Sequence, residues 1–169
     1  IFRDYDSEII HYKTKIKCGE WARCNVEFFV KWEISVFRDG RLYYQDDFSL
    51  EGENVLIDIV SNSLGDNLAY IPYCEEFRKK HNCNVFVKTS ISKILDYPEL
   101  KFVKSGEGKY YSSYKISWFY KGEEVDFMMH PVDFRPQPMQ KTATDILGLE
   151  YIELKPALIA TSSNKKKRY

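Results

Sequence analysis

Residues 55–68 read Val-Leu-Ile-Asp-Ile-Val-Ser-Asn-Ser-Leu-Gly-Asp-Asn-Leu. A short aliphatic run is followed by a loop of small residues closed by Gly65-Asp66 and then by an amphipathic segment, which predicts a strand, a turn and a helix. Open α/β sheets bind their ligands at such strand-to-helix corners. The stretch therefore predicts an α/β fold and makes Asp66 the first candidate for a functional residue.

The residues after this corner continue the pattern of a Rossmann-like domain. The near-continuous aliphatic run at 55–60 is typical of a strand that is covered on both faces of a mostly parallel sheet. Apolar residues spaced by about three and four predict a helix over 66–81 with Asp66 at or near its N-cap. The other predicted elements are strands over 85–87, 100–103, 114–120 and 151–154, a short helix over 91–95, and a helix over 139–147 that stops at Gly148.

The residues before the corner predict a different architecture. Apolar and polar residues alternate over 8–16 and 26–37, which is typical of half-buried strands. Asp39-Gly40 supplies the positive φ that a hairpin turn requires. We therefore expect three parts, namely an antiparallel β module over 1–52, a Rossmann-like domain over 53–155 and a linker over 156–169.

The composition excludes several classes of protein. Lys and Arg together number 25 and so do Asp and Glu, so no global field favours nucleic acid or an anionic bilayer as a partner. No apolar run approaches the roughly 20 residues that a membrane-spanning helix needs. The four cysteines form no C-x-x-C pair, which argues against a zinc site and favours reduced thiols. We expect a soluble, cytoplasmic protein that is a piece of a longer polypeptide.

The candidate residues have both structural and functional interpretations. Asp66 either caps a helix N-terminus or faces the crevice and accepts a proton from an incoming hydroxyl group. His130, Asp133 and Arg135 offer groups for an anion or a sugar, but neighbouring side chains of an extended segment alternate in direction, so a loop packed on the sheet edge is favoured. The basic run at 165–168 is interpreted as a solvated linker in preference to an anion-binding patch.

Six segments spread in order over nearly the whole chain carry a resemblance to a known family. They are GEWAR at 19–23, SLGDNLAYIPY at 63–73, EEFRKKHNC at 75–83, YPELKFV at 97–103, PVDFR at 131–135 and QKTATDILGL at 140–149. Together they resemble the amino-terminal half of the bacterial autotransporter heptosyltransferases. These enzymes belong to the heptosyltransferase superfamily and have two Rossmann-like domains facing across a cleft, the GT-B arrangement.

The resemblance implies a glycosyltransferase that moves heptose from an ADP-activated sugar to serine hydroxyls of an autotransporter adhesin. Asp66 matches the aspartate of the family's Gly-Asp loop, which implies that it is the general base. From their place in this loop, Asn62, Ser63 and Asn67 are candidates for hydrogen bonds to sugar or acceptor hydroxyls. Weaker candidates for shaping the acceptor groove are Asp133, Arg135 and Gln140.

The resemblance does not extend to the carboxyl-terminal Rossmann domain, to which the family's nucleotide-sugar site and four-cysteine iron site belong. We therefore expect no cofactor or metal within this chain, ADP-heptose bound by the other domain, a homo-oligomer in the full-length protein, and no turnover by this fragment alone. Two alternatives stay open. One is a non-catalytic module that binds an adhesin or holds an oligomer together, and the other is a GT-B transferase that uses another nucleotide sugar.

Overall fold

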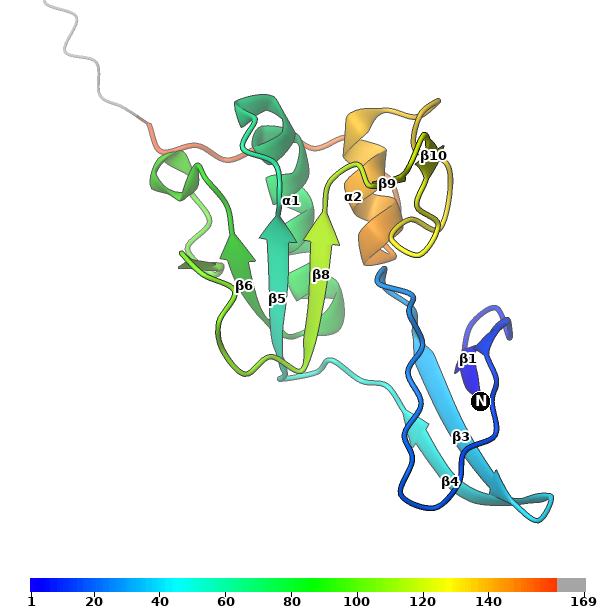
Figure 1. Ribbon diagram of the computed structural model, residues 1–169. Helices are drawn as coiled ribbons and strands as arrows, with labels where there is room; N and C mark the ends of the chain where they lie inside the picture. The colour runs from blue at the N-terminus through cyan, green and yellow to red at the C-terminus, as the bar shows by residue number, and fades with distance from the viewer. Residues whose placement is uncertain (161–169) are drawn as a thin grey trace, which may run out of the picture.

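The protein is described by a computed structural model over residues 1–160. This part contains two four-stranded sheets, with helices packed on the second, and a small two-stranded sheet (Figure 1). The first sheet is antiparallel with the order β2-β1-β3-β4, and the second is parallel with the order β7-β6-β5-β8. The predicted fold class, α/β with an antiparallel β part before a Rossmann-like parallel sheet, is confirmed.

The elements have the following bounds. The first sheet contains β1 (Phe2–Asp4), β2 (Ile10–Tyr12), β3 (Trp32–Arg38) and β4 (Arg41–Asp47). The second contains β5 (Asn54–Ile59), β6 (Asn84–Lys88), β7 (Lys101–Val103) and β8 (Ser112–Ile116). The helices are α1 (Leu64–His81), the short 3₁₀ helix η1 (Ser92–Ile94) and α2 (Met139–Leu147), and a small hairpin is formed by β9 (Tyr120–Lys121) and β10 (Glu124–Val125).

The main core lies between the parallel sheet and its two helices. Every second residue of β5 points to this face, and Val55 and Ile57 are completely buried there. Phe77 of α1 and Ile146 of α2 are buried in the same cluster. Removing each such large apolar side chain from water stabilises the fold by roughly 1.5–3 kcal/mol, so this face fixes how α1 lies on β5.

The opposite face of the sheet combines a buried leucine, Leu56, with an ion pair at its centre. Asp58 of β5 lies in register with Lys88 of β6 and Lys115 of β8, and the Lys88 ammonium is 2.8 Å from the Asp58 carboxylate. Both helices pack on the other face (Figure 1). On the face opposite the helices, Leu56 is buried and only 15% of the Asp58 side chain is exposed, so β5 is covered on both faces as predicted, with an ion pair as part of the cover.

The amino-terminal strands are shorter than predicted. The Asp39-Gly40 turn joins β3 to β4 as expected, but the strands predicted over 8–16 and 26–37 are limited to β2 and β3. The backbone N–H of Phe29 donates to the Ile146 carbonyl over 2.7 Å, and its ring packs on Phe77. The apolar pattern before β3 therefore reflects packing on the helical layer, not pairing in a sheet.

Other boundaries also differ. The strand predicted over 114–120 ends at Ile116, and the short helix predicted over 91–95 is η1. No strand forms over 151–154, where the Ile152 and Leu154 carbonyls accept hydrogen bonds from side chains. Helix α2 ends at Gly148 with φ +62° as predicted.

Neither α1 nor α2, nor any other helix within residues 1–160, combines the length and the apolar character that crossing a bilayer requires. The basic run at 165–168 lies outside the described residues. The boundaries proposed for the β module, the Rossmann-like domain and the linker stay a prediction.

Candidate functional site

The corner between β5 and α1 is built around a serine cap. Ser63 has extended backbone angles, and its hydroxyl accepts a hydrogen bond from the Asp66 N–H over 3.5 Å. Serine is among the preferred N-cap residues because its hydroxyl satisfies an otherwise unpaired N–H group. The cap is therefore Ser63, and Asp66 lies in the first turn of α1, near the N-cap but not at it.

The Asp66 carboxylate is half-buried and unpaired. Within residues 1–160 it accepts no hydrogen bond and forms no ion pair, although the Asp66 backbone N–H is engaged by Ser63. Tyr70 lies one helical turn further along, and burial raises the pKa of its phenol, with the negative charge of Asp66 adding to the rise. The carboxylate is thus a proton acceptor without an internal partner at the carboxyl end of a parallel strand.

Asn67 holds the loop that precedes this carboxylate. Its amide nitrogen donates to the Ser61 and Ser63 carbonyls, each over 2.7 Å, and its amide oxygen accepts from the Thr89 hydroxyl over 2.5 Å. The side chain is completely buried. Asn67 therefore ties the loop after β5 to the end of β6. Its contact with a sugar or an acceptor stays a prediction, and the burial of the side chain argues against it.

The two other loop candidates, Ser63 and Asn62, differ in whether their side chains are free to bind a ligand. The Ser63 N–H donates to the Ser61 hydroxyl over 3.1 Å, so Ser63 is engaged through both its backbone and its side chain. Asn62 is exposed, and its side chain makes no hydrogen bond to residues 1–160. Asn62 is the member of the predicted set that is free to meet a ligand beside Asp66.

The end of β8 lies next to this corner. The Val60 N–H donates to the Ile116 carbonyl over 3.1 Å, so the loops after β5 and β8 leave the sheet side by side. The strand order is β7-β6-β5-β8. After β5 the chain passes through α1 to β6 and β7 on one side of β5, and it then crosses to β8 on the other side. The boundary between β5 and β8 is a topological switch point, where open α/β sheets bind ligands.

Trp118 follows β8 at this switch point and was not among the predicted site residues. Its indole N–H donates to the Thr142 hydroxyl over 3.3 Å, and its ring stacks on Phe134 with 5.6 Å between centroids. The Thr142 side chain also lies against the Tyr70 phenol and partly offsets the rise in the pKa of that group. The sequence predicted Trp118 to lie inside a strand over 114–120, and only the end of β8 at Ile116 places it in the loop beside β5.

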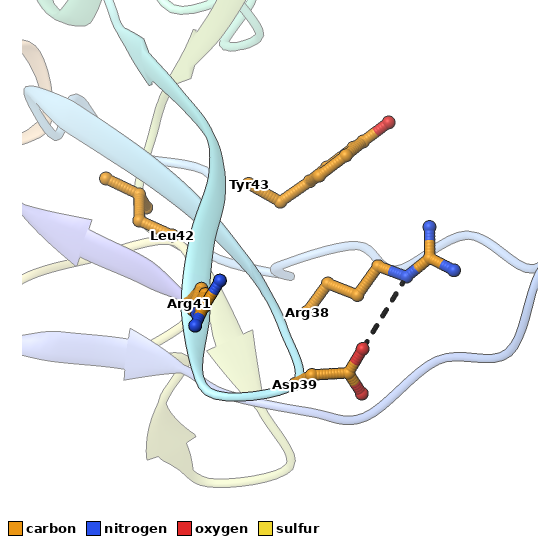
Figure 2. Close-up of a pocket in the computed structure, with 5 residues that line it drawn as sticks. All are labelled: Arg38, Asp39, Arg41, Leu42 and Tyr43. Carbon is orange, nitrogen blue, oxygen red and sulfur yellow. Dashed lines mark ion pairs between the residues drawn. The ribbon is translucent and has the colours of Figure 1, made fainter.

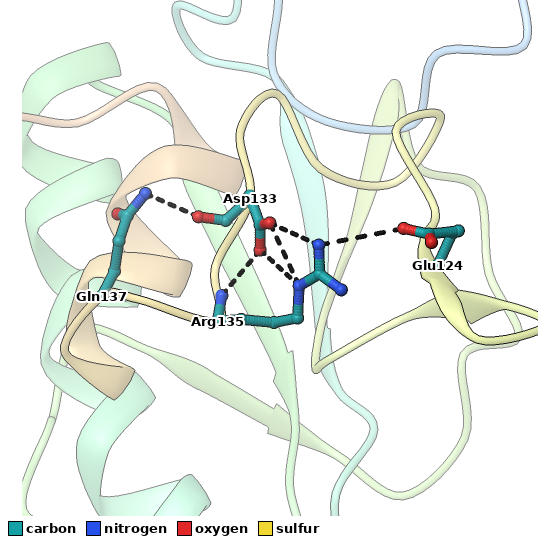
Figure 3. A network of polar contacts seen from close by, with 4 residues as sticks. All are labelled: Glu124, Asp133, Arg135 and Gln137. Atoms are coloured by element: carbon teal, nitrogen blue, oxygen red, sulfur yellow. Dashed lines mark hydrogen bonds and ion pairs between the residues drawn. The ribbon is translucent and has the colours of Figure 1, made fainter.

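Asp133 and Arg135 form a pair with each other (Figure 3). The Arg135 guanidinium donates to both Asp133 carboxylate oxygens and holds the pKa of that carboxyl below its usual range. Glu124 of the small hairpin lies 3.8 Å from the same guanidinium, and the Gln137 amide donates to the Asp133 carbonyl over 2.8 Å. Within the described residues no hydrogen bond or ion pair joins this network to Asp66, so its groove-shaping role stays a prediction.

His130 and Gln140 have internal partners. His130 is buried, and its Nε2 accepts from the Phe119 N–H over 3.0 Å. Gln140 accepts from the Tyr73 hydroxyl over 2.9 Å and donates to the Leu154 carbonyl over 2.8 Å, which fixes the segment that follows α2. His130 therefore does not join Asp133 and Arg135 in one cluster, and a ligand contact of Gln140 stays a prediction.

A hollow of about 460 Å³ lies at the β3–β4 turn (Figure 2), and this turn is far from the β5–α1 corner (Figure 1). Its walls are exposed side chains of the turn, and the Arg38 and Asp39 charges are 3.9 Å apart there. The residues around it are Arg38, Asp39, Arg41, Leu42 and Tyr43. This hollow is a surface concavity of the hairpin and contains none of the candidate residues.

Within residues 1–160, no group of three or more His, Cys, Asp or Glu side chains could hold a metal ion. The described part of the chain therefore offers no set of ligands for the iron that the family implies, and we assign no chemical step to a metal here.

Several known proteins are similar to this chain. The autotransporter heptosyltransferase Aah of Escherichia coli is 32% identical over 171 residues, which cover 96% of this chain and 43% of Aah. The inactive autotransporter heptosyltransferase BimC of Burkholderia thailandensis is 25% identical over 149 residues, which cover 81% of this chain and 34% of BimC. No protein-family model matches the sequence.

The fold agrees with the solved structure of TibC, described as a bacterial iron-containing dodecameric glycosyltransferase from enterotoxigenic E. coli. That structure is 29% identical with a TM-score of 0.84, and the match covers 95% of this chain and 43% of the TibC chain. A second TibC structure, in complex with ADP-D-β-D-heptose, matches with a TM-score of 0.82. This chain spans about two fifths of the length of the curated relatives it matches. It is homologous to the bacterial autotransporter heptosyltransferases and matches the amino-terminal part of these proteins.

Proposed function

We propose that this chain forms the acceptor-binding side of a protein O-glycosyltransferase that transfers heptose from an ADP-activated sugar to serine hydroxyls of an autotransporter adhesin. The observation that carries the proposal is the unpaired Asp66 carboxylate at the β5–β8 switch point. The similarity to Aah and TibC supports the reaction class and the donor.

In the proposed reaction, Asp66 accepts the proton of a serine hydroxyl as the serine oxygen attacks the anomeric carbon of the sugar. The new bond joins that oxygen to the anomeric carbon, and the bond to the diphosphate oxygen breaks, so ADP leaves with the electron pair. A positioned general base of this kind contributes about 10²–10⁴-fold to the rate. The nucleotide sugar is held by residues outside the described chain.

The test is the substitution Asp66→Asn in the complete protein that contains this chain. Asparagine keeps the size of the side chain and removes its basicity, so we expect heptose transfer to fall by about 10²-fold or more while the adhesin is still bound. Asp39→Asn is the matched control, because it also removes one carboxylate but lies at the exposed β3–β4 turn. Transfer at the normal rate by the Asp66→Asn protein would refute the assignment of the base.

A non-catalytic role is the second candidate function. It is supported by the similarity to BimC, which is named an inactive autotransporter heptosyltransferase. In that case the chain binds an adhesin or holds copies together, and Asp66 has no chemical role. An Asp66→Asn protein and its parent would then bind the adhesin equally, and transfer by the complete protein would be unchanged. A pull-down of adhesin together with a transfer assay on the same two proteins separates the two functions.

The location, assembly and donor belong to the same proposal. We expect the complete protein to act in the bacterial cytoplasm, to bind no nucleic acid or membrane, and to form a homo-oligomer, in line with the dodecameric TibC. Competition between ADP-heptose and other nucleotide sugars in a transfer assay tests the donor. Preference for a different sugar would leave the acceptor role intact and would change the donor only.

A further inference from the structure

Trp118 is held rigidly but is not buried. Its indole N–H is bonded to Thr142, and one face of its ring lies flat on Phe134, with 6° between the two planes. Even so, 46% of the residue is exposed. A large aromatic side chain that is fixed in place and still exposed offers contact area to a partner at little cost in conformational entropy.

The exposed ring belongs to the same corner as Asp66. Trp118 lies two residues after Ile116, whose carbonyl accepts from the Val60 N–H over 3.1 Å, so its loop leaves the sheet beside the loop that leads to Asp66. Two further apolar residues of the corner, Val60 and Leu64, are exposed as well. The unpaired carboxylate therefore lies among apolar side chains that stay accessible in this chain.

The charges of the corner limit what can bind there. The loops at 60–66 and 117–118 contain no lysine or arginine, and Asp66 is their one charged residue. A diphosphate or another anion would meet a carboxylate without a neighbouring cation in these loops, which is unfavourable. An uncharged chain with apolar contacts and a hydroxyl group suits this combination.

We propose that the exposed face of Trp118 is a contact surface for the acceptor, which is an uncharged peptide segment whose serine hydroxyl reaches Asp66. This assignment rests on the proposed acceptor-binding function and adds a residue that determines acceptor affinity. The apolar face of the peptide lies on the indole ring, and Asn62 is free to bond to the peptide backbone.

The first test measures transfer kinetics in the complete protein with a short uncharged peptide that contains one central serine, and with ADP-heptose as the donor. Truncation of an aromatic residue that is a hot spot of a binding site costs tenfold or more in affinity. We therefore expect Trp118→Ala to raise KM for the peptide by about tenfold while kcat and KM for ADP-heptose change by less than about twofold. Trp21→Ala is the control, since Trp21 is 80% exposed in the amino-terminal module.

The second test measures binding without turnover. The same peptide is titrated into the Asp66→Asn protein by calorimetry, with and without Trp118→Ala. We expect the second substitution to raise Kd for the peptide by about tenfold. Because this readout needs no transfer, it remains decisive even if Asp66 proves not to be the base.

Two conservative variants separate recognition from packing. Trp118→Phe and Trp118→Leu both keep an apolar side chain against Phe134, but only phenylalanine keeps a flat face. We expect Trp118→Phe to retain most of the peptide affinity and Trp118→Leu to lose it. Equal affinity of these two variants, a change in KM for ADP-heptose instead of the peptide, or failure of the unsubstituted protein to bind the peptide would each overturn the proposal.

Discussion

Acidification should destabilise the protein through His81. This residue ends α1, and its ring packs against those of Phe29 and Phe77, with centroids 4.8 Å and 4.4 Å away. Its Nε2 atom is buried and has no hydrogen-bond partner within the described residues. Burial lowers the pKa of His81 from 6.5 to about 4, and the neighbouring Lys80 charge acts in the same direction.

The sign and size of the effect follow from this shift. Because the pKa is lower in the folded state, a proton binds the unfolded chain more tightly, so stability is complete above pH 6.5 and is lost as the pH falls toward 4. The difference between the two pKa values corresponds to about 3 kcal/mol at pH 4 and to about 2 kcal/mol at pH 5. A loss of about 2 kcal/mol is a large part of the 5–15 kcal/mol that stabilises a typical domain.

Urea unfolding followed by tryptophan fluorescence measures this loss at neutral pH and at about pH 5, where the linkage has developed most of its size. The variant His81→Leu removes the titrating group and keeps an apolar side chain against the two phenylalanine rings. We expect the parent to lose about 2 kcal/mol more than the variant between these two pH values. If His81→Leu loses as much as the parent, acid destabilisation comes from other groups and the reasoning is wrong.

Four further substitutions test the packing and the hydrogen bonds of the fold by urea unfolding, and one of them also by amide exchange. Gly148→Ala places a methyl group against the Phe29 ring at a positive φ, so we expect a loss of about 2–4 kcal/mol. Gly52→Ala has a positive φ but open space and should lose only about 1 kcal/mol, whereas equal losses would contradict the role of packing. Ser63→Ala should cost about 0.5–1 kcal/mol through the lost cap, and no change would argue against that cap. Tyr73→Phe should cost about 1 kcal/mol and speed amide exchange in the segment after α2, and unchanged exchange there would show that the hydroxyl is not its anchor.

The elements that the sequence predicts well depend on local signals. The hairpin at Asp39-Gly40 follows from the positive φ of its turn, and the end of α2 follows from Gly148. The strand and helix on either side of the loop at 60–63 follow from a change in the period of apolar residues. In each case neighbouring residues determine the outcome, so no knowledge of tertiary contacts is needed.

The errors concern residues whose partners are distant in sequence. Phe29 has the alternation of a strand residue, but its partners are in α1 and α2. The aliphatic run around Asp58 correctly predicts burial on both faces, but it does not reveal the ion pair between Asp58 and Lys88. Periodicity shows which residues avoid water but does not show which layer covers them.

Polar site residues are difficult to predict for a related reason. Asn67 and Gln140 have the amide groups that sugar ligands require, and the structure engages both with backbone or side-chain partners. An amide that bonds to a ligand and one that bonds to a carbonyl of its own chain are the same in sequence. Trp118 was assigned to a strand because its contacts with Thr142 and Phe134 are formed only after folding.

The position of the helix cap bears directly on Asp66. A capping role for this aspartate requires its carboxylate to accept an N–H of the first turn, but the Ser63 hydroxyl does this and the carboxylate is left without a partner in residues 1–160. What remains of a structural role is the attraction between its charge and the helix dipole, which is worth about 0.3–1 kcal/mol. A half-buried carboxylate is therefore maintained at the switch point for little structural gain. This balance favours a chemical role, and it predicts opposite effects of two neighbouring substitutions: Ser63→Ala lowers the stability more than the rate of transfer, and Asp66→Asn lowers the rate far more than the stability.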